Sequence, residues 1–168
     1  MAVAVACGIL IARYLGAQDF GKYAFVVALV SFFGCFVDMG LDNIIIRETA
    51  KGREGDFFGA ALLIRSAASV FTLALLGVAV EILDLSPEIT KAAWLAFVTL
   101  VVAKQVGLGI FRAMAIGKER AHFDTFLTVP FQLARLGAVL WVIQTGRSFV
   151  DFFVTFLVVD TLHAIVAL

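Results

Sequence analysis

LGAQDFGKYAFVVALVSFFGCFVDMGLDNIIIRETAKGRE, residues 15–54, contains a polar turn, a long apolar run and a basic exit. Residues 15–21 place two glycines and Asp19 between two apolar segments, which predicts a turn between two helices with Asp19 as the N-cap. The apolar run from Tyr23 to Val37 carries no charge and continues, after Asp38 and Asp42, to Ile46. It is long enough to cross the roughly 30 Å hydrocarbon core of a bilayer. The stretch therefore predicts a membrane hairpin with an acid inside it.

The whole chain is apolar. Of its 168 residues, 62% are hydrophobic and 15% are charged, and the mean hydropathy is +1.05. A soluble domain is typically about 45–50% apolar and about 25% charged, so the excess is more than a soluble core of this length can bury. The formal net charge is zero, which argues against a nucleic-acid partner. We therefore expect a single integral membrane domain over residues 1–168.

Apolar segments repeat along the chain and predict an all-α bundle of about six transmembrane helices. The expected helices span residues 1–14, 23–46, 57–83, 92–114, 125–145 and 149–168. The first is shorter than the roughly 17–25 residues that a span needs, and the chain stops within apolar sequence. We therefore expect a truncated first helix and a fragment of a longer protein. In the polar turn over residues 84–91, Pro87 is placed to begin the next helix.

Basic residues in the loops predict the orientation in the membrane. The loops after the second and fourth segments hold Arg47, Lys51, Arg53, Arg112, Lys118 and Arg120, and the loops after the first, third and fifth hold Arg13, Lys22, Lys91 and Arg147. Cytoplasmic loops carry an excess of Lys and Arg, so this bias places the N-terminal side of the first segment in the cytoplasm. We therefore expect a multi-pass protein of the inner membrane with this orientation.

Sequence patterns typical of catalysis or metal binding are missing. The chain has no glycine-rich phosphate loop, no H-E-x-x-H and no Cys/His cluster. Cys7 and Cys35 both lie in apolar runs, where burial as small hydrophobic residues is expected rather than a disulfide or a metal site. We therefore expect a protein that is not an enzyme and that uses no catalytic residue, cofactor or metal.

Three basic residues, Arg65, Lys104 and Arg135, lie inside apolar segments and not in loops. A charge at the centre of a transmembrane helix costs about 2.5–3.5 kcal/mol on insertion scales, so each needs a wet or paired environment. Helical spacing collects further polar residues on the same faces. These polar stripes comprise Arg65, Ser69 and Thr72; Thr125, Thr128, Gln132 and Arg135; Ser31, Cys35, Asp38 and Asp42; and Lys104 with Gln105.

The polar stripes have two interpretations. In the first, they form interhelical hydrogen bonds and ion pairs, for example between Asp38 and Arg65 or Lys104. In the second, three cations against one deep anion leave a positive surplus in the interior, which a phosphate or pyrophosphate would neutralise. The second interpretation predicts a cationic substrate path formed by Arg65, Lys104 and Arg135, with Asp38 as counter-charge and with Ser69 and Gln132 as polar lining.

Asp160 and His163 lie one helical turn apart in the last segment. They could relay protons, since histidine titrates near neutral pH. A satisfied polar pair near the end of a helix is the alternative.

The first fifty residues carry a pattern that resembles a known family of membrane proteins. The motif "A-R-x-L-G-x-x-x-F-G-x-Y", then "D-x-G-L" and "R-E", is typical of the polysaccharide transporter (O-antigen flippase) family, within the superfamily of multidrug, oligosaccharidyl-lipid and polysaccharide exporters. The matching residues are Ala12-Arg13-Tyr14-Leu15-Gly16, Phe20-Gly21-Lys22-Tyr23, Asp38-Met39-Gly40-Leu41 and Arg47-Glu48. Phe111-Arg112-Ala113 to Gly117-Lys118 also resembles the exit of that family's fourth helix.

This resemblance implies a bundle of twelve to fourteen helices in two lobes that flips polyprenyl-pyrophosphate-linked oligosaccharide across the inner membrane. The chain would be most of the first lobe, with the membrane lipid, the lipid-linked oligosaccharide and a C-terminal lobe of the same protein as partners. Alternating access by rocking of the two lobes would be the mechanism. A cation-coupled multidrug exporter of the same superfamily and a non-transport membrane assembly protein are the alternatives.

Overall fold

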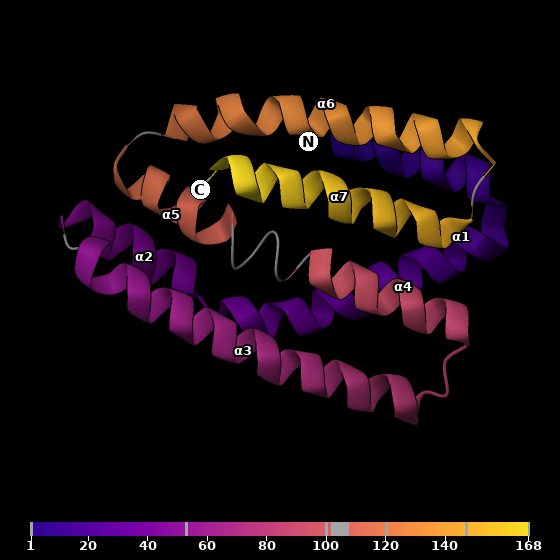
Figure 1. Cartoon of the computed structure of the whole chain (residues 1–168), viewed down its shortest axis with the longest axis horizontal. Coiled ribbons are helices and arrows are strands. Elements are labelled where there is room, and N and C mark those ends of the chain that lie inside the picture. The colour runs from indigo at the N-terminus through magenta and orange to yellow at the C-terminus, as the bar shows by residue number, and fades with distance from the viewer. Residues whose placement is uncertain are drawn as a thin grey trace.

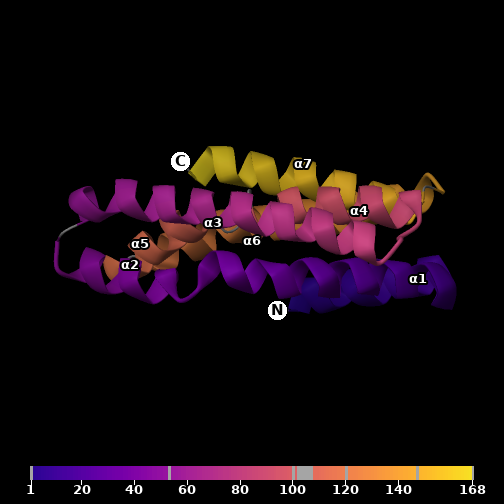
Figure 2. The ribbon, with the colours of Figure 1, turned by 90° about the horizontal axis from the view of Figure 1, so that it is seen from below.

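The computed structural model describes residues 2–52, 54–99, 101, 108–119, 121–146 and 148–167. In these ranges the chain is an all-α bundle of seven helices without a strand, which confirms the predicted fold class. The helices are α1 (Ala2–Asp38), α2 (Leu41–Ala50), α3 (Glu54–Ile82), α4 (Pro87–Phe97), α5 (Ile110–Gly117), α6 (Ala121–Gln144) and α7 (Phe149–Ala167). Most of them run along one common axis, with the α3–α4 turn at one end of the bundle and with α2 and α5 toward the other end (Figures 1 and 2).

α1 is a hairpin of two helical legs that meet at Gly16. The chain runs from its N-terminus to one end of the bundle and then returns along it (Figure 1). Gly16 has φ 69° and ψ −178°, a combination that essentially only glycine adopts. The turn predicted over residues 15–21 is therefore present but narrower. Asp19 is wrong as an N-cap, because it lies within the second leg and forms an ion pair with Lys22 at 2.8 Å.

The second leg of α1 ends at Asp38, where the predicted helix over residues 23–46 breaks. Met39 and Gly40 have φ of 40° and 81°, in the left-handed region, and α2 begins at Leu41. Residues 17–38 span about 33 Å at 1.5 Å per residue, close to the thickness of the hydrocarbon core. The second leg can therefore cross a bilayer before the break.

The remaining helices follow the predicted segments with shifted ends. α3, α6 and α7 lie within a few residues of the expected ranges. The fourth segment, predicted over residues 92–114, starts earlier because Pro87 takes a position in the first turn of α4, as expected from its fixed φ. α5 forms the end of the same segment, and residues 100 and 102–107 between them lie outside the described part of the chain.

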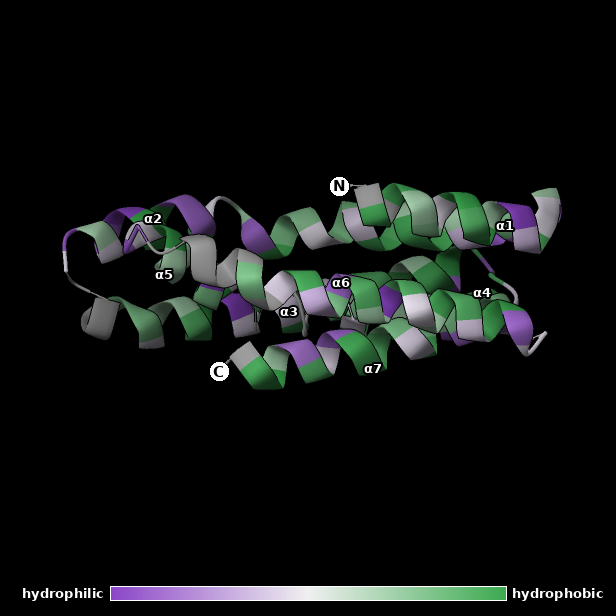
Figure 3. Ribbon diagram, turned by 90° about the horizontal axis from the view of Figure 1, so that it is seen from above, coloured by the Kyte–Doolittle hydropathy of each residue, from purple (hydrophilic) through white to green (hydrophobic). Residues whose placement is uncertain are grey.

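Three helices in the described residues contain stretches long and apolar enough to cross a membrane: Val5–Asp38 of α1, where the second leg alone has the length, Phe57–Ile82 and Phe149–Val166. Apolar residues line these helices along most of their length, whereas hydrophilic positions gather at α2 and near the turn of α1 (Figure 3). On α3, large side chains such as Leu63, Phe71 and Ile82 are exposed. In water so much exposed apolar surface would promote aggregation, whereas lipid solvates it.

Among the described residues, three apolar clusters hold the bundle together. The largest joins the second leg of α1 to α3, α4 and α7, with the buried residues Val26, Val30, Val37, Leu76, Val80, Ala92, Ala93, Ala96, Phe97, Val101, Phe149 and Phe153. A second joins the first leg of α1 to α6 and α7, through Cys7, Ile11, Val139, Val142, Phe152 and Phe156. A third is small and joins α2, α3 and α5, through Ile45, Ala61, Ile110 and Ala113.

α3 presents one continuous buried stripe whose middle is polar. Its buried positions are Ala61, Arg65, Ser69, Thr72, Leu76 and Val80. The spacing of three or four residues places all of them on one face of the helix, as the 3.6-residue period requires. Ala61 belongs to the small third cluster and Leu76 to the largest cluster. The inward-facing polar part of α3 therefore lies between two apolar clusters.

Gly16 should be the position in α1 that tolerates a side chain least. Replacement of Gly16 by Ala forces a Cβ onto a backbone that L-residues avoid, and we expect a loss of about 1–3 kcal/mol in the free energy of unfolding. Gly21→Ala is the matched control, because Gly21 is helical and no atom lies within 4 Å of an added Cβ. That variant should gain roughly 0.5–1 kcal/mol. Reversible unfolding in lipid bicelles measures both; equal effects would contradict the hairpin geometry.

Candidate functional site: two arginine clusters

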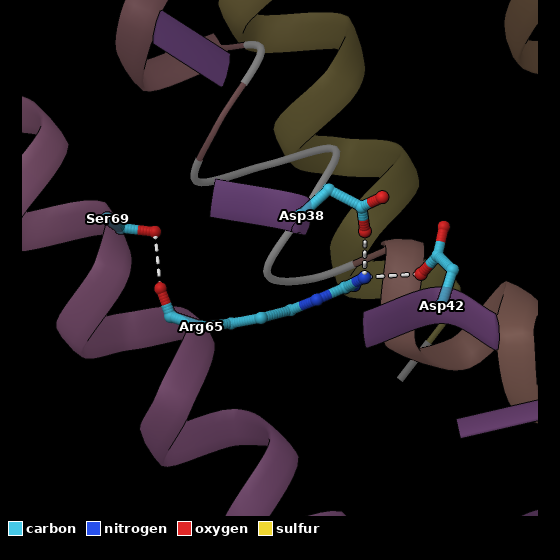
Figure 4. A network of polar contacts seen from close by, with 4 residues as sticks. All are labelled: Asp38, Asp42, Arg65 and Ser69. Atoms are coloured by element: carbon cyan, nitrogen blue, oxygen red, sulfur yellow. Dashed lines mark hydrogen bonds and ion pairs between the residues drawn. The ribbon is translucent and has the colours of Figure 1, made fainter. Parts of the chain in front are cut away.

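The joint between α1 and α2 is held to α3 by one arginine. Arg65 Nη2 donates a hydrogen bond of 2.8 Å to Asp38 Oδ1 and a second hydrogen bond to Asp42 Oδ1 (Figure 4). Asp38 is the last residue of α1 and Asp42 lies in the first turn of α2. The two carboxylates thus flank the helix break and converge on the same nitrogen. We call Asp38, Asp42 and Arg65 the joint cluster.

Burial differs sharply across the joint cluster. The side chain of Arg65 is 1% exposed, whereas those of Asp38 and Asp42 are 38% and 48% exposed. A buried guanidinium needs anions because taking a charge out of water costs several kcal/mol. The first turn of α2 also favours Asp42 as an anion, through the positive end of the helix dipole. The arginine is therefore the buried member, and the aspartates connect it to solvent or headgroups.

The hydroxyls next to Arg65 are used within α3 itself. Ser69 Oγ donates to the carbonyl oxygen of Arg65 at 2.7 Å, and Thr72 Oγ1 donates to that of Ala68 at 2.7 Å. Such bonds to the preceding turn satisfy a hydroxyl without a partner on another helix. The predicted inward face of Arg65, Ser69 and Thr72 is confirmed by their burial, while the role of Ser69 as lining stays a prediction.

The second cluster lies between α6 and α7 and contains Arg135. Its Nη1 lies 3.9 Å from Asp160 Oδ2, and its Cζ lies 4.0 Å from the centroid of the Phe156 ring. Phe156 and Asp160 are one turn apart on α7, so the guanidinium packs on an aromatic face and reaches a carboxylate on the same helix. Arg135 is 30% exposed and Asp160 is 7% exposed, so here the acid is the buried partner. We call Arg135, Phe156 and Asp160 the seam cluster.

His163 lies one turn beyond Asp160 and is buried. Its ring stacks on Phe131 of α6, with centroids 4.4 Å apart and an interplanar angle of 14°. Asp160 and His163 thus both face α6, and each contacts a different residue of it. The proton relay predicted for this pair stays a prediction.

The charge balance differs from the sequence-based expectation. Three cations against one deep anion predicted a positive surplus, but Arg65 has two aspartates beside it and Arg135 has Asp160. Asp38 is also less deep than expected, because the helix ends there. The sequence offers Arg65 and Lys104 as alternative ion-pair partners of Asp38, and the structure shows the pair with Arg65. Local sequence patterns do not predict which residues form these ion pairs, because the partners lie on different helices.

The structure does not bring the predicted path residues into one place. Arg65 and Arg135 belong to separate clusters on α3 and α6, two helices that lie at opposite edges of the bundle in Figure 1. Lys104 and Gln105 lie outside the described residues, and Gln132 is half-buried on α6. Cys7 is buried as predicted, but Cys35 is exposed; the two are free in the part of the chain that is described.

Sequence reasoning gave no role to two residues that complete the clusters. The polar stripe of the second segment includes Asp42 but does not pair it with Arg65, and no predicted stripe includes Phe156. The sequence does carry one signal for Asp42, because it follows Asp38 by four residues and so shares its face on the predicted helix. Nothing in the sequence marks Phe156 among the 17 phenylalanines of the chain.

Long apolar helices, exposed apolar side chains and a buried arginine paired with acids of other helices are the features of a polytopic α-helical membrane protein. A family model described as "Polysaccharide biosynthesis protein" matches residues 4–168, and the chain belongs to that family. This confirms the family resemblance found in the first fifty residues and extends it over nearly the whole chain. Comparisons with curated proteins and with solved structures give no match.

The unequal burial in the joint cluster predicts unequal effects of charge removal. Arg65→Leu leaves two half-exposed carboxylates that water can solvate, so we expect a loss of only about 1 kcal/mol in unfolding free energy. Asp38→Asn together with Asp42→Asn takes two charge partners from a buried guanidinium, and we expect a loss of about 3–5 kcal/mol. Unfolding in bicelles measures both. The control Asp19→Asn, at an exposed ion pair, should leave the unfolding midpoint unchanged; a larger loss for Arg65→Leu would contradict the assignment of burial.

Proposed function

We propose that the protein is a transporter and not an enzyme, and that it flips polyprenyl-pyrophosphate-linked oligosaccharide across the inner membrane. The family places the chain in polysaccharide biosynthesis, and its apolar helices fit a protein of the membrane. The observation that carries the proposal is the presence of arginines, Arg65 and Arg135, inside helices whose outer faces are apolar. Charges within membrane helices are costly and mark substrate or ion pathways.

The anionic pyrophosphate is the part of this substrate that arginine would recognise. A guanidinium offers planar, paired donors that match phosphate oxygens. Asp38 and Asp42 are half-exposed, so an arriving phosphate could exchange with a carboxylate at Arg65 without uncovering a dry ion pair. Arg135 is itself partly exposed and could exchange its single carboxylate in the same way. Lys104 remains the third proposed cation of the path.

Alternating access requires a second lobe, and we propose that a C-terminal lobe of the same protein packs against this bundle. The two lobes would rock about a site between them, as transporters built from repeated halves do. The membrane lipid and the lipid-linked oligosaccharide are the other proposed partners. Asp160 and His163 stay candidates for a proton relay that would drive the movement.

Two other functions remain as alternatives. A cation-coupled multidrug exporter is favoured by one observation, namely that the joint cluster holds two aspartates and one arginine. A non-transport assembly protein would have a dry interior, and the in-helix hydrogen bond of the Ser69 hydroxyl fits such an interior.

Removal of the three cations should abolish transport. In the intact natural protein, Arg65→Gln, Lys104→Gln and Arg135→Gln together should reduce cell-surface polysaccharide by at least about tenfold, because the headgroup loses its charge partners. Immunoblots of surface polysaccharide and of the membrane-inserted protein measure export and expression. Lys91→Gln, at an exposed cation on α4, is the matched control and should export normally. Normal export by the triple variant would overturn the proposal. If Asp38→Asn together with Asp42→Asn blocks drug efflux and leaves polysaccharide export unchanged, the multidrug exporter is favoured.

Orientation and hydration can be tested by one labelling experiment. α2 and α5 lie toward one end of the bundle, and the turn between α3 and α4 lies at the other (Figure 1). The positive-inside rule then puts the end with Arg47, Lys51, Arg112 and Lys118 in the cytoplasm. We expect a membrane-impermeant maleimide to label a cysteine at position 91 in intact cells, but one at position 51 only after lysis. The reverse pattern would contradict this orientation.

Cysteines at positions 69 and 132 test the hydration of the interior. Labelling at these positions indicates a wet path, and its absence indicates the dry interior of an assembly protein.

A further inference from the structure

The joint between α1 and α2 is weakly held by its own backbone. Met39 N still donates to the carbonyl oxygen of Cys35 at 3.3 Å, but Asn43 N donates to that of Gly40 at 3.2 Å, so the spacing changes from four residues to three. Gly40, the N-cap of α2, provides no side-chain hydrogen bond. Met39 has φ of 40°, which a residue with a Cβ rarely adopts. A backbone of this kind is a natural place for two helices to change their angle.

α2 is bound much more closely to α5 than to α3. A Cβ on Gly117, the last residue of α5, would lie 2.7 Å from Thr49 Cβ and 2.8 Å from the carbonyl oxygen of Ile46. The backbones of α2 and α5 therefore approach so closely that no side chain fits at this point. Ile45 adds to this interface by packing in one cluster with Ile110 and Ala113. α2 and α5 therefore form one packed unit, which we call the α2–α5 unit.

The contact between α2 and α3 is small by comparison. The small apolar cluster takes only one buried residue from the described part of α3, the methyl side chain of Ala61. One turn further along α3, Arg65 reaches across to Asp38 and Asp42. These two residues lie on opposite sides of the Met39–Gly40 joint, so a single guanidinium restrains both helices that meet there (Figure 4). The carboxylates are half-exposed, so water can replace the guanidinium at each of them.

We propose that Met39–Gly40 is a hinge and that Arg65 is the latch that holds the α2–α5 unit against α3. With both ion pairs formed, the angle between α1 and α2 is fixed. When one or both carboxylates leave Arg65, the α2–α5 unit swings away from α3 as one body, because its internal packing is tighter than its contact with α3. The latch concerns the shape of the protein alone and does not depend on the proposed function or on any substrate.

Spin-label distances in the intact natural protein test the latch. The labels replace Ile44 on α2 and Leu63 on α3, two exposed residues, in a background with Cys7→Ala and Cys35→Ala and in liposomes without substrate. We expect one narrow distance distribution for the latched protein. Asp38→Asn and Asp42→Asn should each add a second, longer distance between the two labels. In the unchanged protein the state with the longer distance is minor, and the double variant should raise its population by about tenfold. Met39→Gly alone softens the joint and should leave the single distance in place.

Two matched controls separate a hinge from simple loss of structure. A label pair at Ile44 and Ile116, both exposed and within the α2–α5 unit, should keep its distance in every variant. A pair at Phe32 and Val70, on α1 and α3, should also stay unchanged because neither residue lies beyond the hinge. An unchanged 44–63 distance in the double variant overturns the latch, and a parallel change of the 44–116 distance overturns the rigid unit. If the double variant does not fold, the two single variants decide by the same criteria.

Discussion

A guanidinium that is buried in an apolar helix must keep anions within reach, and at Arg65 this requirement determines how α1, α2 and α3 meet. Arg65 is the largest fully buried side chain in the described part of the chain. Its partners come from the end of one helix and the start of the next, so α1 has to stop beside α3 and α2 has to start there. The break in the membrane helix and the buried charge therefore depend on each other.

The bilayer imposes the remaining organisation. Backbone groups in lipid must pair within their own segment, which leaves helices as the elements, and the apolar outer faces need no covering by protein. Association of the helices then rests on packing and on a few polar contacts. The hairpin of α1 shows this well, because Tyr14 and Tyr23 meet Phe152 and Phe153 of α7 at centroid distances of 6.1 and 5.1 Å. These aromatic contacts hold the hairpin of α1 against α7.

The two arginine clusters have opposite designs. In the joint cluster the cation is buried and its anions are half-exposed, whereas in the seam cluster the anion is buried and the cation lies on an aromatic face. In each cluster the more exposed member of the ion pair can exchange its partner while the other member stays buried. This property suits a protein that has to accept an anionic headgroup and release it again, and it also allows the joint cluster to open as a latch. Family membership and buried charge thus support the same proposal from independent observations.

The sequence by itself determined the fold class, most of the helices, the turn before the second leg of α1 and the start of α4 near Pro87, because hydrophobic length and local conformational preference are local properties. The 3.6-residue period also placed Arg65, Ser69 and Thr72 on an inward face. Only the tertiary structure decided that the helix breaks after Asp38, since a glycine is tolerated inside a membrane helix and need not end it. It alone decided the ion partners of Arg65 and Arg135 as well, because a partner on another helix depends on how the helices are placed in space, which no local pattern records.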